Sequence, residues 1–511
     1  MQFNSYLFIL LFLPVTLAGY YGFYHMNRGT WARGFLAAMS LLFFACGNPW
    51  YLGLLLGSVL FNWALSGMTG RRGPAGKCGL AGRRGLAGRR GPAGKCGSAG
   101  KAGSAGREGR SRQYGWLVFG IIANLALLFY FKYFNFFIEN MNALLGKDVA
   151  FTKLLLPVGI SFFTFQQIAW LVDSFRGETG GYTFLDYLLF TVYFPKIAMG
   201  PILLHGEFIP QLKEESRHKA NPKAMAEGLM ILSAGLFKKV IVAEFFAGPV
   251  NWGFAQVDIL SSSDGFLVML AYTFQLYFDF SGYCDMAMGI SRMLGLDLPL
   301  NFDSPYKALS PVEFWKRWHM TLTRFLRRYI YFPLGGSRKG TLRTYVNIMI
   351  IFLISGLWHG ADWTFILWGA LHGMAQALNR AFQAQWERLH TAFQWMATFL
   401  FVNLTWVIFR ADSISQAKLF FKRLVNVGSM QINPSFMDSF KMVELPSRVT
   451  DHRVFTVLFL YVAALYLVMN TRNMGETSLR PTLLRGAGTA VMLVWSILSL
   501  AGISSFIYFQ F

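Results

Sequence analysis

The chain has 511 residues, of which 54% are hydrophobic and only 14% charged, and its formal net charge is +22. Soluble domains usually contain about 25% charged residues, so this composition excludes an ordinary soluble protein. The positive net charge does not require a nucleic-acid partner. Lysine and arginine gather in the cytoplasmic loops of membrane proteins, and this positive-inside rule accounts for the charge.

Long apolar runs recur along the whole sequence. A run of about 18 apolar residues is long enough to cross a bilayer as a helix. The runs are Tyr6–Tyr24, Gly34–Trp50, Tyr51–Met68, Tyr114–Ile138, Leu154–Val172, Phe184–Leu204, Ala224–Val250, Phe266–Ile290, Tyr345–Met374, Phe393–Phe409, Phe455–Met469 and Ala487–Phe509. We therefore expect an all-α, polytopic membrane protein with roughly ten to twelve transmembrane helices and additional re-entrant or interfacial helices. The start, MQFNSYLF, lacks a basic segment and a cleavage site, so the first run is expected to be a retained helix.

A basic, glycine-rich segment separates the third and fourth runs. Glycine occupies every third position from Gly70 to Gly109, the period of collagen. Residues 69–113 carry twelve Lys or Arg and one acid, so the segment is expected on the cytoplasmic side, with the N-terminus outside. The composition favours a flexible, solvated insert, and contact with anionic lipid or a collagen-like trimer are the alternatives. The four cysteines have no metal-ligand spacing, so neither a metal site nor a disulfide framework is expected.

Polar side chains inside apolar runs are candidates for function, because burying them in a membrane is costly. The first group lies in TFQLYFDFSGYCDMAMG, Thr273–Gly289. It contains Gln275, Asp279, Ser281 and Asp285, and the last two are four residues apart and share one helical face. The pattern is compatible with hydrogen bonding between helices and with a substrate path through the membrane.

The second group lies in FWKRWHMTLTRFLRRYIYFPLGGSRKG, Phe314–Gly340, a basic, aromatic and amphipathic segment that contains His319. One interpretation is an interfacial helix whose cations face lipid headgroups. The other is a re-entrant segment that carries His319 into the protein and offers cations to the phosphates of an anionic thioester, such as coenzyme A or phosphopantetheine. The candidate donor-binding cations are Lys316, Arg317, Arg324 and Arg328.

The third group lies in ISGLWHGADWTFILWGALHG, Ile354–Gly373. His359 follows Trp358 and precedes Asp362 by three residues, and we assign Trp358 and Asp362 to the substrate path. A single buried histidine is more often a core residue than a catalyst, but a neutral imidazole is also a good general base. The sequence has no phosphate-binding loop, GxSxG or HExxH pattern, so two histidines on separate apolar segments point to acid–base chemistry within a membrane.

Together these segments resemble the membrane-bound O-acyltransferase family, and within it the bacterial branch that includes the alginate O-acetyltransferase membrane subunit. The resemblance covers nearly the whole chain except the glycine run. It rests on WKRWHMTLTRFLRRYIYFPLGGSRKGTLRTY, GLWHGADWTFILWGALHG, LPVGISFFTFQQIAWLVDSFRGE, YFPKIAMGPI, TFQLYFDFSGYCDMAMGISRMLG, NLTWVIFRAD and the terminal FIYFQF. It implies that His359, in the WHG motif, is catalytic and that His319, in the RWH motif, takes part.

The resemblance further implies an O-acyltransferase that moves an acyl group, expected to be acetyl, across the bacterial inner membrane. The donor would be a cytoplasmic thioester, either acetyl-CoA or an acyl carrier, with no bound cofactor. The product would be an O-acetylated extracytoplasmic polysaccharide such as alginate, completed by a periplasmic or extracellular acetyltransferase partner. Residues 1–68 would be N-terminal transmembrane helices, 69–113 an insert, and 114–511 the catalytic core with the C-terminal helices.

Two features depart from the pattern of this branch, and three other functions stay open. Arg327, Arg328 and Tyr329 stand where Arg-Asp-Tyr is typical, and the glycine run is not a family feature. The alternatives are D-alanyl transfer from a carrier protein to teichoic acid, a non-enzymatic membrane transporter, and a collagen-like membrane scaffold.

Overall fold

The computed structural model describes residues 1–70, 104–149, 156–426, 428, 430–440, 453–470 and 482–501, with the backbone alone at 104–109, 453 and 470. Most of the glycine run and the FIYFQF motif lie outside these ranges, and so do the predictions made for them. All regular secondary structure within the ranges is helical, which confirms the all-α prediction.

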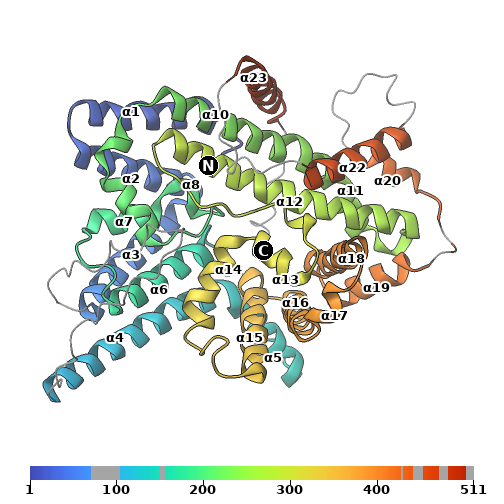
Figure 1. Ribbon diagram of the computed structural model, residues 1–511, viewed down its shortest axis with the longest axis horizontal. Helices are drawn as coiled ribbons and strands as arrows, with labels where there is room; N and C mark the ends of the chain where they lie inside the picture. The colour runs from blue at the N-terminus through green and yellow to red at the C-terminus, as the bar shows by residue number, and fades with distance from the viewer. Residues whose placement is uncertain are drawn as a thin grey trace.

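The helices follow one another in a long series (Figure 1). Those of the first half are η1 (Phe8–Phe12), α1 (Leu13–His25), α2 (Gly29–Ala45), α3 (Pro49–Thr69), α4 (Ser104–Leu128), η2 (Phe129–Tyr133), α5 (Phe134–Leu145), α6 (Ile160–Phe175), α7 (Phe184–Val192), α8 (Phe194–Ile197), α9 (His205–Lys213), η3 (Glu215–His218), α10 (Pro222–Phe237), η4 (Lys238–Ala243) and α11 (Glu244–Ala255). Those of the second half are η5 (Val257–Ile259), α12 (Ser262–Met293), η6 (Pro305–Lys307), α13 (Pro311–Arg317), α14 (Met320–Leu326), η7 (Arg327–Tyr331), α15 (Thr341–His359), α16 (Trp363–Ala381), α17 (Gln383–Glu387), α18 (Thr391–Arg410), α19 (Ile414–Leu424), α20 (Pro434–Asp438), α22 (Arg453–Asn470) and α23 (Leu483–Leu498).

Several helices have the length and composition of membrane spans. Among the described residues, five stretches meet both criteria: Phe8–His25, Pro49–Thr69, Arg110–Leu145, Thr341–His359 and Thr391–Arg410. Shorter apolar helices cover Gly29–Ala45, Val454–Met469 and Leu483–Leu498. The chain is therefore an integral membrane protein with several spans, and the count of ten to twelve stays a prediction.

Several of the predicted runs are not continuous helices, and two are broken well inside their length. Tyr345–Met374 contains most of α15 and most of α16. The two helices are separate because the backbone becomes extended at Gly360 and the Asp362 side chain then caps α16 by accepting a hydrogen bond from the Thr364 N–H. Phe184–Leu204 is divided into α7, the short α8 and a non-helical stretch that includes Pro201. Proline lacks the N–H that a helix interior needs, and glycine and Asp favour helix boundaries, so apolar composition overestimated helix length here.

The predicted interfacial helix over Phe314–Gly340 is also interrupted. Trp318 and His319 separate α13 from α14, and His319 has a left-handed backbone with φ of +44°. The polypeptide thus turns at the histidine, and both flanking helices place it in the interior.

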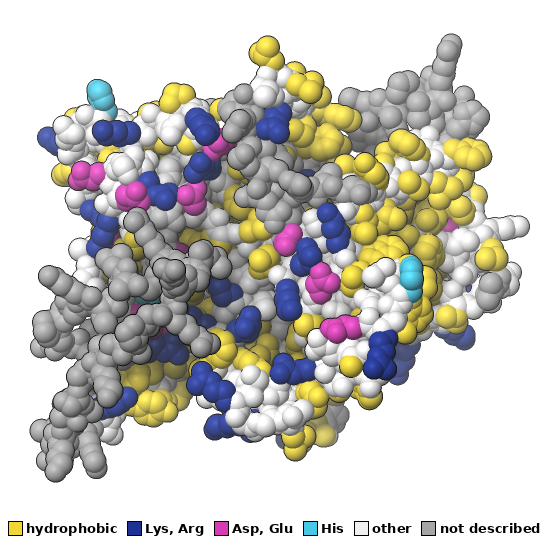
Figure 2. All heavy atoms as spheres, in the orientation of Figure 1, with side chains coloured by type: hydrophobic (Ala, Val, Ile, Leu, Met, Phe, Trp, Pro, Cys, Tyr) yellow, Lys and Arg dark blue, Asp and Glu magenta, His cyan; other side chains and the backbone are white. Residues whose placement is uncertain are grey.

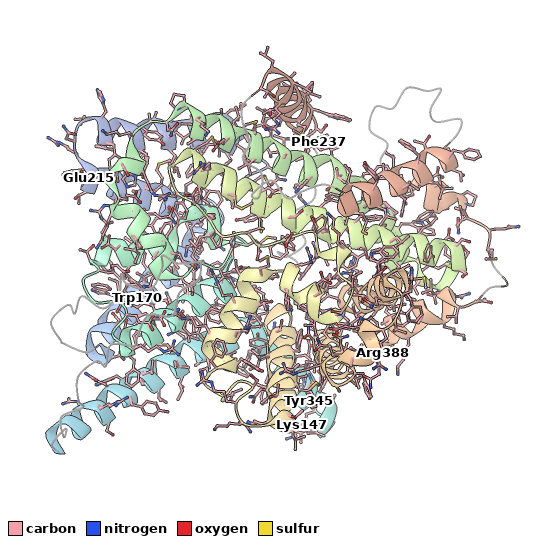
Figure 3. All side chains as sticks on the ribbon, in the orientation of Figure 1. Lys147, Trp170, Glu215, Phe237, Tyr345 and Arg388 are labelled. Atoms are coloured by element: carbon pink, nitrogen blue, oxygen red, sulfur yellow. The ribbon has the colours of Figure 1, made fainter. Side chains whose placement is uncertain are left out.

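The most extensive helix–helix contact among the described residues joins α12 to α10, and the two run side by side across the upper half of Figure 1; η4 continues α10 and also packs against α12. The approach is close because glycines line it: a Cβ added to Gly235 would lie 2.7 Å from the carbonyl oxygen of Gly282. Helices α13 to α16 lie below α12 in this view, and Tyr345 marks the outer end of α15 at the lower edge of Figure 3. Helix α15 therefore carries His359 from the edge toward the interior.

Charged side chains are not confined to the glycine run. Figure 2 shows Lys and Arg spread over the centre and left of one face, among fewer acidic side chains, while hydrophobic side chains gather toward its right-hand side. The described part of the chain therefore has a polar, cation-rich face in addition to its apolar helices.

Candidate active site

The two histidines singled out in the sequence come together in the interior. Their ring centroids are 6.4 Å apart, and the ring planes make an angle of 75°. His319 is 0% and His359 4% exposed. One is placed by the turn between α13 and α14 and the other by the end of α15, so the pair depends on tertiary packing.

Aromatic rings surround the histidine pair. Trp358 contacts both rings, with centroids 6.0 Å from His319 and 4.9 Å from His359. Phe280 packs edge-on against His319, while Trp368 and Phe409 pack against His359. These walls are apolar, so they exclude water from the neighbourhood of the imidazoles. Trp358, assigned to the substrate path from the sequence, is therefore part of the site's lining.

A backbone carbonyl sets the tautomer of His359. Its Nδ1 lies 2.6 Å from the carbonyl oxygen of Ser355, one turn earlier in α15. A carbonyl oxygen can only accept, so Nδ1 carries the proton and Nε2 is the basic nitrogen of the neutral ring. A base at Nε2 is the atom that an acyl-transfer reaction with a hydroxyl acceptor needs.

An asparagine sets the tautomer of His319. Oδ1 of Asn301 accepts a hydrogen bond from the Thr321 backbone N–H at 3.2 Å, which identifies that atom as the oxygen. The same Oδ1 lies 3.1 Å from Nδ1 of His319, so Nδ1 must be the donor. Nε2 of His319 is buried without a hydrogen-bond partner among the described residues. In the neutral form of either imidazole, Nε2 is therefore the nitrogen that can accept a proton.

Asn301 was not recognised in the sequence, and it also holds the strained turn. Its backbone carbonyl accepts from the Met320 N–H at 2.9 Å, directly after the left-handed His319. Its Nδ2 donates to Sγ of Cys284 at 3.3 Å. The available signal was a single amide after the apolar Leu-Pro-Leu that follows α12, and only its long-range contacts give it significance.

The acidic residues predicted for the substrate path are held in ion pairs. Asp279 lies 2.5 Å from Nζ of Lys239, and both side chains are almost fully buried. Asp285 lies 2.6 Å from Nζ of Lys238. Both lysines belong to the π-helix η4, beside α12. This geometry matches the interpretation of these residues as helix–helix contacts, and a role in a substrate path stays a prediction.

The two uncharged polar residues predicted for the substrate path, Gln275 and Ser281, make fewer hydrogen bonds than the two aspartates. Oε1 of Gln275 and Oγ of Ser281 are buried and have no hydrogen-bond partner within the described ranges. An unpaired polar atom in an apolar interior is costly, so these two atoms are better candidates for contact with a polar substrate than the paired carboxylates.

The predicted donor-binding arginines already have acidic partners. Arg317 pairs with Glu313 and Asp303, and Arg324 pairs with Glu207 at 2.7 Å. Lys316 is exposed, and the described part of the chain gives it no ion pair. A phosphate would therefore meet Lys316 directly but would compete with carboxylates for the arginines, and donor binding by this set stays a prediction.

Arg328, at the position where this branch typically has Asp, is balanced by two acids, Asp173 in α6 and Glu178 in the turn that follows it. Its guanidinium lies 3.2 Å from Asp173 and 2.5 Å from Glu178. Asp173 also accepts from Tyr329 and His205, and although burial opposes its ionisation, these contacts and the charge of Arg328 hold its pKa below the ordinary value. Ligand atoms of Asp173, Glu178 and His205 all lie within 4.8 Å of one another, a spacing that suits a metal, but Arg328 provides the positive charge there.

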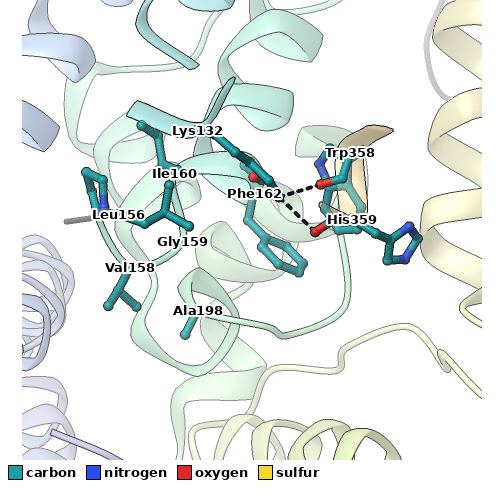
Figure 4. Close-up of a pocket in the computed structure, with 11 residues that line it drawn as sticks. Lys132, Leu156, Val158, Gly159, Ile160, Phe162, Ala198, Trp358 and His359 are labelled. Carbon is teal, nitrogen blue, oxygen red and sulfur yellow. Dashed lines mark hydrogen bonds between the residues drawn. The ribbon is translucent and has the colours of Figure 1, made fainter. Parts of the chain in front are cut away.

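A small cavity adjoins the backbone of His359 (Figure 4). It has a volume of about 80 Å³ and is lined by Lys132, Leu156, Pro157, Val158, Gly159, Ile160, Ser161, Phe162, Ala198, Trp358 and His359. Nζ of Lys132 donates to the carbonyl oxygens of Trp358 at 2.7 Å and His359 at 2.9 Å. The imidazole of His359 points away from Lys132, so the cavity reaches the end of α15 from the side opposite the ring.

Comparison with known proteins identifies the family of the chain. The model of the membrane-bound O-acyltransferase family matches residues 112–415, a range that contains both histidines. The chain belongs to the membrane-bound O-acyltransferase family. A second model, the collagen triple helix repeat, matches residues 65–115. At the two ends of that match, however, the described residues are α-helical, in α3 and α4.

Relatives with curated names match most of the chain in some cases and less than half of it in others. Peptidoglycan O-acetyltransferase of Helicobacter pylori is 38% identical, over 84% of this chain and 81% of that protein. Probable alginate O-acetylase AlgI of Pseudomonas aeruginosa is 35% identical, over 85% of this chain and 76% of that protein. Teichoic acid D-alanyltransferase of Streptococcus thermophilus is 27% identical, over 45% of this chain and 58% of that protein.

Proposed function

We propose that this acyltransferase moves an acetyl group from a cytoplasmic thioester to an acceptor hydroxyl on the other side of the membrane, with His359 as general base. The proposal depends on one observation: two buried imidazoles lie next to each other, and each donates a hydrogen bond from Nδ1 to a protein oxygen. In each neutral ring Nε2 is therefore the basic nitrogen, and both rings lie in an apolar and aromatic site.

The proposed step is direct acyl transfer. The acceptor oxygen bonds to the thioester carbonyl carbon while its proton passes to Nε2 of His359. The C–S bond then breaks, the carbonyl re-forms, and the thiolate takes the proton from the imidazolium, which returns to the neutral ring. His319 orients the reacting groups through its own Nε2. The aromatic walls limit loss of the thioester to water.

The relatives support acetyl as the group and a glycan as the final acceptor. The two relatives with broad coverage carry O-acetyl names and act on peptidoglycan or alginate by those names. The D-alanyl relative matches less than half of the chain. We therefore propose O-acetylation of an extracytoplasmic polysaccharide, with a separate transferase outside the membrane as partner.

The donor and the orientation follow from charge. Exposed Lys316 and the cation-rich face suit the phosphates of acetyl-CoA or of a phosphopantetheine carrier. The positive-inside rule places such a face and the basic glycine run in the cytoplasm of a bacterial inner membrane. The donor thioester then enters from the side on which acetyl-CoA and carrier proteins occur.

The test compares acetyl ester in the polymer of a deletion strain complemented with wild type, His359→Ala or His319→Ala, each normalised to membrane protein. We expect His359→Ala to lower the rate by about 10²–10⁴-fold, the usual contribution of general acid–base catalysis. We expect His319→Ala to lower the acetylation rate less than His359→Ala does, but still by more than about tenfold. The reason is that His319 orients the reacting groups and does not accept the proton.

His372→Gln is the matched control. Nδ1 of His372 accepts from Nε1 of Trp315 at 3.1 Å, and its Nε2 lies 3.0 Å from Oγ1 of Thr405, so both nitrogens are engaged in structure. This variant should keep its acetylation rate per folded molecule. Full activity of His359→Ala would contradict the mechanism. Release of D-alanine instead of acetate from the polymer would contradict the acetyl assignment but leave the role of His359 intact.

A further inference from the structure

We propose that Lys132 and Tyr133, neighbours in the π-helix η2, are positioning residues that hold His359 in place by capping the carboxyl end of α15. The proposal rests on the role proposed for His359. Tyr133 Oη donates to the carbonyl oxygen of Leu357 at 2.8 Å. Lys132 Nζ donates to the next two carbonyl oxygens, at 2.7 and 2.9 Å. Two adjacent side chains thus satisfy three consecutive carbonyls that end at the catalytic histidine.

The carbonyls need such donors because of where α15 ends. The last carbonyls of a helix have no partner within the helix, and the break at Gly360 removes the following turn. Within a membrane span water does not replace the missing donors, and each unsatisfied carbonyl is costly. Lys132 and Tyr133 therefore stabilise the helix end at the point where His359 must be held.

Interruption of the apolar helix places the two donors together. A π-helix, η2, separates α4 from α5, and it has more residues per turn than an α-helix, so consecutive side chains diverge less. Lys132 and Tyr133 can then approach the same helix end. Single-turn π-helices are frequent at functional sites, and this one lies within the longest candidate span, Arg110–Leu145.

Because the donor is a cation, we infer that Lys132 does more than satisfy the carbonyls at the helix end. A lysine inside a membrane span is expensive, and a neutral hydroxyl or a glycine turn would cap a helix at lower cost. The positive charge is complementary to the negative end of the α15 dipole. Fraying of the last turn would also move the Ser355–His359 hydrogen bond, which sets the tautomer of the catalytic ring. Lys132 thus controls His359 without touching the reacting atoms.

The test uses Lys132→Met, Lys132→Arg and Tyr133→Phe in full-length protein in the deletion strain. The rate of acetyl-ester formation per membrane-bound molecule is measured beside the thermal unfolding midpoint of each purified protein. We expect Lys132→Met to lower the rate by about 10–100-fold, as for partners that orient an active-site ligand, and Tyr133→Phe by about 3–10-fold. Lys132→Arg should recover most of the rate, because arginine can donate to both carbonyls.

Matched controls are Tyr130→Phe, which alters a half-exposed tyrosine of the same η2, and Lys147→Met, which alters an exposed lysine after α5. Both should retain the wild-type rate. A Lys132→Met protein with the wild-type rate per folded molecule, whatever its unfolding midpoint, would overturn the proposal. His359→Ala is assayed in parallel. Full activity of that variant would refute the role of His359 as the general base. An inactive His359→Ala beside a fully active Lys132→Met would refute only the positioning role of Lys132.

Discussion

At the scale of single residues, the site depends on which atoms of the two imidazoles carry protons. The Ser355 carbonyl and the Asn301 amide oxygen each accept from Nδ1, so both rings keep Nε2 as the basic atom. Asn301 does this for His319 while its backbone also supports the left-handed turn. Asn301, which does not itself exchange protons, therefore determines which nitrogen of His319 is basic.

Asn301→Ala tests this role. It removes the acceptor, leaves Nδ1–H of His319 buried and unpaired, and frees the ring to change tautomer. We expect acetylation to fall by about 10–100-fold, as for other partners that orient a functional histidine. Cys284→Ala is the control, since it removes the sulfur that accepts from Nδ2 but leaves Oδ1 in place. Rates are measured per membrane-bound molecule, and equal rates in the two variants would contradict the assignment.

At the scale of elements, ion pairs connect α12 to η4 inside the protein. The pair of Lys239 and Asp279 is almost fully buried, whereas Lys238, bound to Asp285, keeps a 21% exposed side chain. Removing one partner of a buried pair leaves an uncompensated charge, which is worse than replacing both partners with apolar residues. The two pairs should therefore respond differently to the same substitution.

Lys239→Met is expected to destabilise the detergent-solubilised protein by about 3–5 kcal/mol, and Lys239→Met combined with Asp279→Leu to restore much of that loss. Lys238→Met should cost less, because the Lys238 side chain is partly exposed and the remaining carboxylate is less deeply buried. Thermal unfolding measures all three. The double variant also separates the two interpretations of Asp279: an active double variant identifies a helix–helix contact, and a folded but inactive one identifies a substrate-path residue.

At the scale of the whole molecule, the glycine run leaves and rejoins the fold at nearly one place. Nε2 of Gln113 donates to the carbonyl oxygen of Gly70 at 3.3 Å, and α3 and α4 pack against each other on either side. Residues 112–415 match the acyltransferase family, whereas the run matches the collagen repeat. The described residues on either side of the run are thus close together, and the run as an insert between two helices stays a prediction.

Deleting residues 74–100 tests the insert. The six residues left between Gly70 and Ser104 span up to about 23 Å when extended, enough to rejoin the two helices without strain. We expect membrane abundance and acetylation to stay within about twofold of wild type, because the composition of the run predicts a solvated insert that contributes little to packing. Crosslinking of the full-length protein into a trimer that the deletion abolishes, together with lost activity, would instead support the collagen-like alternative.

The sequence by itself determined the class of protein, since long apolar runs require helices in a membrane, and its motifs identified the family and both histidines. It did not reveal the break at Gly360, because apolar composition continues through it. Nor did it reveal Asn301, Lys132 or Lys239, although lysines inside apolar runs were a visible signal. Local composition specifies where helices form, but which donor meets which buried acceptor depends on residues far apart in the chain. Only the tertiary structure therefore showed that the two imidazoles lie side by side and which nitrogen of each ring carries the proton. It also showed that most of the predicted arginines and acids already have partners of opposite charge.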